Sequence, residues 1–198
     1  QVLVGTQLVA KGLDFPGVTL VGVLNADVGL AWPDFRAAER TFQLLCQVAG
    51  RAGRAEKPGK VVVQTYSPDH RAIQCARNHD YVGFYRAELE ARRTNLYPPF
   101  VHLIRIVFEG RDGARVKAAA QAAAVRLEQI GVKADEGRVH YKGAAPAPLQ
   151  KLRGRYRWHL IIKALEAEEA LQAARSLVAG FRPKGCEIAV DVDPVDML

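Results

Sequence analysis

The pattern of apolar and polar residues predicts both strands and helices in the first half of the chain. Short apolar runs typical of strands buried in a parallel sheet occur at residues 2–4, 18–24 and 60–65. Ser67 followed by Pro68 predicts a helix N-terminus, because proline favours the first helical position. Asp80 is a candidate cap for a second helix. After it, apolar residues at helical spacing are expected in the core rather than in an exposed aromatic stripe: Tyr81, Phe84, Tyr85 and Leu89.

The pattern changes after residues 97–100, Tyr-Pro-Pro-Phe, which stop a helix because proline disfavours helix in the residue before it. The strands predicted beyond this point are residues 100–108, 138–142, 155–163 and 186–192. The predicted helices are residues 112–130 and 166–178, ended by Gly131 and Gly180. Residues 143–154 are rich in alanine and proline and predict an exposed loop. The order β-α-β-β-α-β is ferredoxin-like.

The predicted strand at residues 155–163 has two different faces, because successive side chains point to opposite sides. The side chains expected in the core are Tyr156, Trp158, Leu160 and Ile162. The other face carries Arg155, Arg157, His159 and Lys163. This second face is either a solvated surface or a site for a polyanion, such as DNA phosphates or an acidic peptide.

The positive charge of the chain is concentrated in the same region. The 198 residues include 28 Lys and Arg against 21 Asp and Glu, a net charge of +7. Residues 137–165 contain seven basic residues and no acidic residue, so they account for the entire excess. A polyanion site is therefore expected on this segment if the chain has one.

Composition excludes several classes of protein. Hydrophobic residues make up 49% and charged residues 25%, as in ordinary globular proteins. No apolar run approaches the ~20 residues that span a bilayer, and no secretory leader is visible. Cys46, Cys75 and Cys186 are widely spaced and form no C-x-x-C pair. We therefore expect reduced thiols in a cytoplasmic protein, with no membrane partner and no metal site in this chain.

A glycine- and arginine-rich stretch at residues 47–54 reads Q-V-A-G-R-A-G-R. On a helix, the spacing of Gln47, Arg51 and Arg54 places all three on one face. Each guanidinium can bind two phosphate oxygens, so an arginine pair on one face suits a polyphosphate. The two glycines suggest that a ligand approaches the backbone closely. The alternative is a solvated helix end.

A second stretch at residues 5–16 reads G-T-Q-L-V-A-K-G-L-D-F-P and lies between two predicted strands. A strand followed by Gly-Thr and a short helical turn presents backbone N–H groups and a hydroxyl to phosphate. Lys11 adds a positive charge near Thr6. Taken singly, Thr6 is as well explained as a helix cap and Asp14 as a turn residue.

Together these stretches resemble motifs V and VI of superfamily-two helicases. Further segments narrow the resemblance to the PriA family of primosomal replication-restart helicases (primosomal protein N′), and it covers the whole chain. These segments are residues 24–28 around Asp27, D-F-R-A-A-E-R at 34–40, Y-P-P-F at 97–100 and D-V-D-P at 191–194.

The resemblance implies an α/β fold in three parts. Residues 1–67 would be the C-terminal part of RecA-like helicase lobe 2, residues 68–99 a helical connector, and residues 100–198 a ferredoxin-like domain that binds DNA and partners. The chain contains no Walker A phosphate loop or Walker B Asp-Glu pair. We therefore expect a C-terminal fragment that is inactive alone, within an ATP-dependent DNA helicase.

The resemblance also implies roles for individual residues. Arg51 and Arg54 would be catalytic, stabilising charge on the transferring phosphate of ATP, with Gln47 and Asp14 also at the nucleotide. Thr6 and Lys11 would contact one DNA strand. The expected DNA contacts in the C-terminal domain are Arg153, Arg155 and Arg157. ATP and Mg²⁺ would bind the full-length protein, and zinc would bind only an upstream module that is not in this chain.

The implied function is 3′-to-5′ unwinding at stalled replication forks, followed by primosome assembly and replication restart. The implied partners are branched and single-stranded DNA, other primosome proteins, and the acidic C-terminal tail of single-stranded DNA-binding protein (SSB). Arg155 falls on a family position for that tail, and position 159 is often Gln in the family, so His159 departs from the pattern. The alternative is a non-catalytic scaffold that binds DNA and SSB in a protein whose motor is degenerate.

Overall fold

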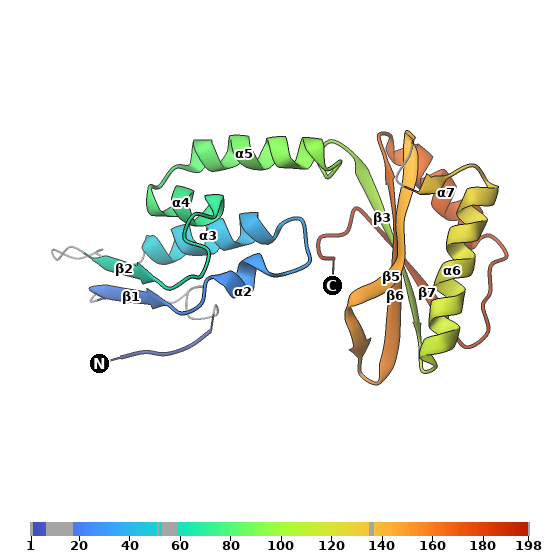
Figure 1. The fold of residues 1–198 in the computed structure, drawn as a ribbon, viewed down its shortest axis with the longest axis horizontal. Coiled ribbons are helices and arrows are strands. Elements are labelled where there is room, and N and C mark those ends of the chain that lie inside the picture. The colour runs from blue at the N-terminus through green and yellow to red at the C-terminus, as the bar shows by residue number, and fades with distance from the viewer. Residues whose placement is uncertain (1, 7–17, 51, 53–58, 135–136, 198) are drawn as a thin grey trace. The chain divides into compact units, whose positions relative to one another are not determined.

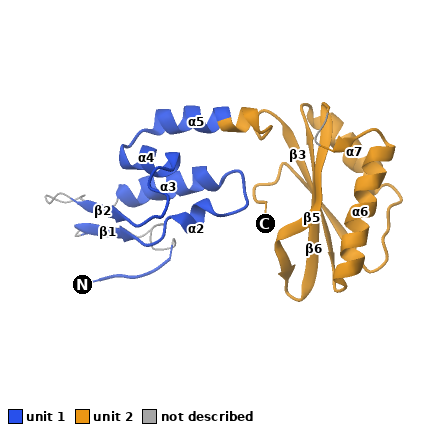
Figure 2. Ribbon diagram, viewed as in Figure 1, with its two compact units in different colours: residues 1–90 blue, residues 91–198 orange. Residues whose placement is uncertain are grey.

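The computed structural model describes residues 2–6, 18–50, 52, 59–134 and 137–197 (Figure 1). The chain packs into two compact units, residues 1–90 and 91–198, and the boundary falls within helix α5 (Tyr81–Thr94) (Figure 2). Both units mix helices and strands, which confirms the predicted α/β class. The predicted three-part division at residues 67 and 99 stays a prediction.

Unit 1 contains a parallel pair of strands, β1 (Leu20–Val23) and β2 (Lys60–Val63). Both strands lie within residues predicted to be extended. The helices of unit 1 are α2 (Asp27–Leu30), α3 (Ala37–Ala49), α4 (Arg71–Arg77) and the first part of α5. Their apolar faces form one core, in which Phe42 of α3 stacks on Phe84 of α5 with ring centres 4.2 Å apart.

Unit 1 differs from the sequence prediction at three places. Residues 2–4 are exposed and form no strand. Helix α4 begins at Arg71 rather than at Pro68, because the ring of His70 caps it by accepting the Ala72 N–H at 3.2 Å. Tyr81 and Tyr85 are not core residues, since they are 66% and 50% exposed.

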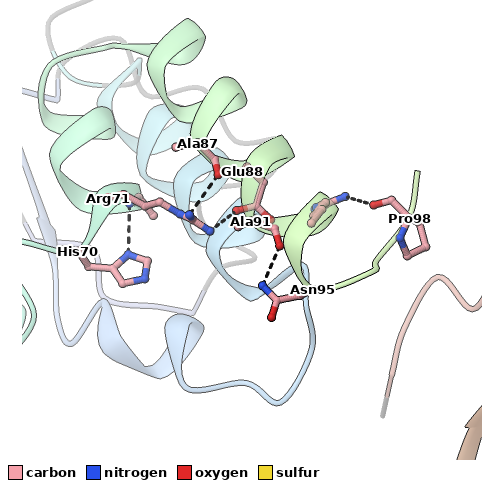
Figure 3. Close-up of polar contacts among 9 residues, drawn as sticks. His70, Arg71, Ala87, Glu88, Ala91, Asn95 and Pro98 are labelled. Carbon is pink, nitrogen blue, oxygen red and sulfur yellow. Dashed lines mark hydrogen bonds and ion pairs between the residues drawn. The ribbon is translucent and has the colours of Figure 1, made fainter. Parts of the chain in front are cut away.

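Arg71 explains which face of α5 is buried (Figure 3). Its guanidinium donates to the carbonyl oxygen of Ala87 at 3.2 Å and forms an ion pair with Glu88 at 2.9 Å. Glu88 is therefore buried on the same side as Phe84. Asp80 caps α5 as predicted, accepting the N–H of Gly83 at 2.8 Å.

Unit 2 consists of a sheet with two helices. Its elements are β3 (His102–Gly110), α6 (Gly113–Gln129), β4 (Lys133–Ala134), β5 (Val139–Leu152), β6 (Arg155–Ala164), α7 (Ala167–Val178) and β7 (Glu187–Val192). Within the described residues the strand order is β4-β5-β6-β3-β7. The four longer strands are antiparallel to their neighbours, and the two-residue β4 is a parallel addition that the sequence did not predict.

Helices α6 and α7 cover the same face of this sheet (Figure 1). Alternate residues of β3 and β6 point into the core beneath them, including Phe108, Leu160 and Ile162. Asp112 caps α6 by accepting the N–H groups of Ala114 and Arg115, and Gly131 follows the helix with a positive φ of 87°. Within the described ranges, every helix is too short or too polar to cross a bilayer.

The prediction of an exposed loop at residues 143–154 is wrong. Most of this segment belongs to β5, which pairs with β6 except at two register shifts, between Gly143 and Ala145 and between Pro146 and Lys151. Strand β6 offers a continuous row of backbone partners, and irregular pairing accommodates the prolines that otherwise disfavour a strand.

Candidate functional site

The residues of unit 1 that were expected to contact the nucleotide or DNA lie mostly outside the described part of the chain. Lys11, Asp14, Arg51 and Arg54 all belong to undescribed segments. Thr6 is exposed and belongs to no helix or strand. Gln47 is exposed on the last turn of α3, which ends at Ala49 with Gly50 as its C-cap. The roles assigned to these residues stay predictions.

Asp27 joins the segments that follow the two parallel strands of unit 1. Its carboxylate accepts hydrogen bonds from the Thr65 hydroxyl at 3.0 Å and the Tyr66 N–H at 2.9 Å. These bonds, that of the Tyr66 N–H above all, lower the pKa of Asp27. The aspartate therefore has a structural role, fixing the segment after β2 against the start of α2.

Asp34 organises the start of α3. Its side chain is almost fully buried, accepts the N–H of Arg36 at 2.9 Å and pairs with Arg40 at 3.1 Å. The segment 34–40 was singled out in the sequence only as a family resemblance. An acidic residue just before a helix is favoured by the helix dipole, so Asp34 itself was a usable signal for the start of α3.

Strands β5 and β6 are joined by a two-residue turn, Arg153-Gly154. Both residues have positive φ, 49° and 80°, which is the backbone conformation of a tight hairpin turn. Leu152 and Arg155 are paired across it. Arg153 is exposed at the tip.

We call Arg155, Arg157 and His159 the basic row, because they lie on alternate positions of one face of β6. Acidic residues of two strands meet this row. Arg155 pairs with Glu109 at 2.9 Å and with Glu187 at 2.8 Å, and Arg157 lies 3.8 Å from Glu109. The bond to Glu187 also raises the pKa of Arg155.

The register of the sheet explains these ion pairs. Glu109 of β3 lies opposite both Arg157 of β6 and Glu187 of β7. The sequence could not reveal this, because Glu109 and Glu187 are far from residues 137–165 along the chain. The basic face predicted as a solvated surface or a polyanion site is thus partly neutralised by neighbouring strands.

His159 is half-buried in the basic row. Burial lowers its pKa to about 4, and the positive charges of Arg105 and Arg157 contribute in the same direction. The ring is therefore neutral at pH 7. Among the described residues, none hydrogen-bonds its Nδ1 atom. A neutral His159 can accept or donate a hydrogen bond but adds no positive charge.

Lys163 does not belong to an exposed surface. It is 1% exposed, and its ammonium donates to the carbonyl oxygens of Asn95 at 3.0 Å and Leu96 at 2.8 Å. Lys163 therefore serves the fold rather than a ligand.

The face of β6 opposite the basic row was predicted to lie in the core, and only part of it does. Leu160 and Ile162 are core residues, but Tyr156 is 39% exposed and Trp158 is only partly buried. Lysines lie over both rings, Lys151 at 4.7 Å from the centre of Tyr156 and Lys117 at 5.8 Å from that of Trp158. Tyr156 and Trp158 lie beside the first turns of α6, where the helix begins to cover the sheet.

The β5-β6 hairpin of unit 2 brings together side chains of the types that can bind anions. In the part of the chain that the structure describes, His, Cys, Asp and Glu form no cluster of three that could hold a metal ion. The hairpin instead combines arginines, lysines and aromatic rings, the side chains that contact nucleic-acid backbones and bases.

Comparisons with known proteins identify the family. Residues 93–195 match the family model described as the primosomal protein N C-terminal domain. The chain is 41% identical over 205 residues to the replication restart protein PriA of Bacillus subtilis, covering all of this chain and 25% of that protein. It is 44% identical over 200 residues to PriA of Treponema pallidum, covering all of this chain and 30% of that protein. The chain thus spans less than a third of either relative.

The family model covers more than half of the chain, and its match includes every strand and helix of the sheet unit. The chain therefore belongs to the PriA family of replication restart proteins and contains that family's C-terminal domain.

Proposed function

We propose that this chain is the C-terminal portion of an ATP-dependent 3′-to-5′ DNA helicase that recognises stalled forks and restarts replication by primosome assembly. Family membership supports this proposal, since the relatives are replication restart proteins. The proposed partners are branched and single-stranded DNA, the SSB tail and other primosome proteins.

Unit 1 would supply the end of RecA-like lobe 2. Its parallel strands β1 and β2 with flanking helices support this, because such lobes are built on parallel sheets. Arg51, Arg54, Gln47 and Asp14 would bind ATP, with Arg51 and Arg54 stabilising the charge of the transferring phosphate, and Thr6 and Lys11 would contact DNA. ATP with Mg²⁺ supplies the free energy for unwinding when bound to the full-length protein.

Unit 2 would be a ferredoxin-like domain that binds DNA and partners. The strand order β5-β6-β3-β7 supports this fold, with β4 as an added edge strand. Arg153, Arg155 and Arg157 would contact DNA, and Arg155 with His159 would bind the SSB tail.

One observation carries the binding role of unit 2. The two arginines of the basic row, Arg155 and Arg157, are paired with acids from other strands, and the Glu187 carboxylate that pairs with Arg155 is 77% exposed. An exposed ion pair is worth about 0–1 kcal/mol, so a phosphate or a peptide carboxylate can replace Glu187. Arg155 would then exchange an internal partner for an external one.

The experiment compares the 198-residue chain with the double variant Arg155→Ala, Arg157→Ala. Affinity for single-stranded and forked DNA is measured over a range of salt concentrations, with an SSB tail peptide as a separate ligand. If both arginines contact phosphate, the log–log salt slope falls by about 1.4 on single strands and about 1.8 on duplex. Unchanged slopes and unchanged peptide affinity would remove the basic row from binding.

The motor role is tested in the full-length protein with Arg54→Ala. Loss of an arginine that stabilises the transferring phosphate costs about 10³–10⁵ in rate in related systems, so we expect ATP turnover to collapse while DNA affinity stays near wild type. Wild-type full-length protein without DNA-stimulated turnover would instead favour the non-catalytic scaffold.

A further inference from the structure

Two lysines outside the basic row carry charges that the fold leaves available. Lys151 of β5 and Lys117 of α6 are exposed, and each ammonium lies over an aromatic ring of β6. Within the described residues, no carboxylate forms an ion pair with either lysine. This is the reverse of the basic row, where Glu109 and Glu187 compensate the arginines.

The sheet explains why the rings hold the lysines in place. Lys151 and Tyr156 are cross-strand partners, so their side chains leave the hairpin on the same side. Gly113 at the start of α6 lies against the Tyr156 ring, where a Cβ atom would come within 3.2 Å of the ring carbons. Lys117 follows one turn later on α6 and lies over Trp158.

An ammonium over a ring is attracted to the ring without losing its net charge. The contact restricts the side chain, and the charge stays open to an external anion. Lys151 also lies two residues before Arg153, the exposed arginine at the hairpin turn. Lys151 and Lys117 therefore lie where the hairpin meets α6, and Arg153 lies beyond Lys151 at the turn.

We propose that the surface formed by Lys117, Lys151, Arg153, Tyr156 and Trp158, here called the helix-side surface, binds the phosphate backbone of single-stranded DNA. This inference rests on the proposed DNA-binding function and adds a second face of the hairpin to it. Lys117 and Lys151 are the new contacts, and they add their own share of the salt-dependent affinity to that of Arg155 and Arg157.

Single-stranded DNA fits this surface better than other polyanions do. Rows of cations beside partly exposed aromatic side chains are typical of single-strand sites, where phosphates meet the cations and bases meet the rings. Tyr156 exposes 39% of its surface beside Lys151, which gives a base an apolar contact next to a phosphate contact. A short acidic peptide would use the charges and leave the rings unused.

The test measures binding of the 198-residue chain to labelled oligo(dT) across a range of salt concentrations. The variant Lys117→Ala, Lys151→Ala is compared with Lys133→Ala, Arg138→Ala, which removes the same charge near the β4 edge of the sheet. We expect the first variant to flatten the salt slope by about 1.4 and the second to leave it near wild type. Lys117→Arg, Lys151→Arg keeps the charge and should keep the slope.

The outcomes separate this inference from the proposed function. A wild-type chain without salt-dependent binding would overturn both. An unchanged slope in Lys117→Ala, Lys151→Ala, with a flattened slope in Arg155→Ala, Arg157→Ala, would overturn the helix-side surface and leave the proposed function standing. If Lys117→Ala, Lys151→Ala loses affinity for an acidic tail peptide but not for oligo(dT), single-stranded DNA is not the ligand of the helix-side surface. Equal thermal unfolding of the variants confirms that the fold is retained.

Discussion

The ammonium group of Lys163 lies 3.8 Å from the centre of the Tyr97 ring. The same group donates to the carbonyl oxygens of Asn95 and Leu96, the two residues that follow α5. Carbonyls at a helix C-terminus have no partner within the helix, and a cation is a favourable one. Strand β6 thus carries, next to its last residue, the lysine that fixes the segment after α5, whereas its first half carries the basic row.

Replacing Lys163 with Met should destabilise unit 2. Methionine fits the apolar stem but leaves the carbonyl oxygens of Asn95 and Leu96 without the donor. Hydrogen bonds to a charged group contribute about 1.5–3 kcal/mol, so we expect the free energy of unfolding to fall by roughly 2–3 kcal/mol in urea denaturation. Lys133→Met, at an exposed position, should change it by no more than about 0.5 kcal/mol. Equal effects would contradict the role of Lys163.

His159 should make stability dependent on pH. Its pKa is about 4 in the folded chain and about 6.5 when unfolded, so the unfolded chain takes up a proton first as the pH falls. The free energy of unfolding therefore decreases from about pH 6.5 to about pH 4.

The variant His159→Gln removes this titration and serves as the control. Between pH 7 and pH 5 we expect the wild-type chain to lose about 1–2 kcal/mol more stability than the variant, after allowance for solvent screening at a half-buried site. Parallel pH profiles of the two chains, measured by chemical denaturation, would show that the burial and nearby arginines do not set the protonation of His159.

Gly110 at the end of β3 should not tolerate a side chain. A Cβ atom there would lie 2.5 Å from the carbonyl oxygen of Gly185 and 2.9 Å from a methyl carbon of Val116. The backbone oxygen cannot move aside cheaply, so Gly110→Ala should cost about 1–3 kcal/mol of stability by thermal or urea unfolding. Gly22→Ala, where nothing lies within 4 Å, should be close to neutral. If Gly110→Ala left the stability unchanged, the close packing of Gly110 against Gly185 and Val116 would be contradicted.

Local signals predicted much of the fold. Asp112 and Gly131 marked the two ends of α6, and alternation marked β3 and β6. The loop prediction at residues 143–154 was wrong because proline and alanine disfavour strands locally, whereas pairing with β6 decides the outcome. The cap at Ser67 was wrong because the His70 ring supplied the acceptor instead.

The candidate site was less predictable, because it depends on partners distant in sequence. Periodicity placed Arg155, Arg157 and Lys163 on one face, but only the sheet register brings Glu109 and Glu187 to the arginines. The lysine instead meets residues 95–97, which belong to the segment between α5 and β3. Tyr156 was predicted to be a core residue because strand alternation places it on the same face as Leu160. The start of α6 at Gly113 instead leaves it half-exposed.

The most direct test of the account maps oligo(dT) onto the 198-residue chain by NMR titration at low salt. If the hairpin is the DNA contact, backbone amide shifts should concentrate at residues 151–158 and in the first turns of α6, and should vanish at high salt, since phosphate contacts are screened. Shifts confined to unit 1, or shifts in unit 2 that leave the hairpin unchanged, would contradict the claim that this hairpin binds DNA.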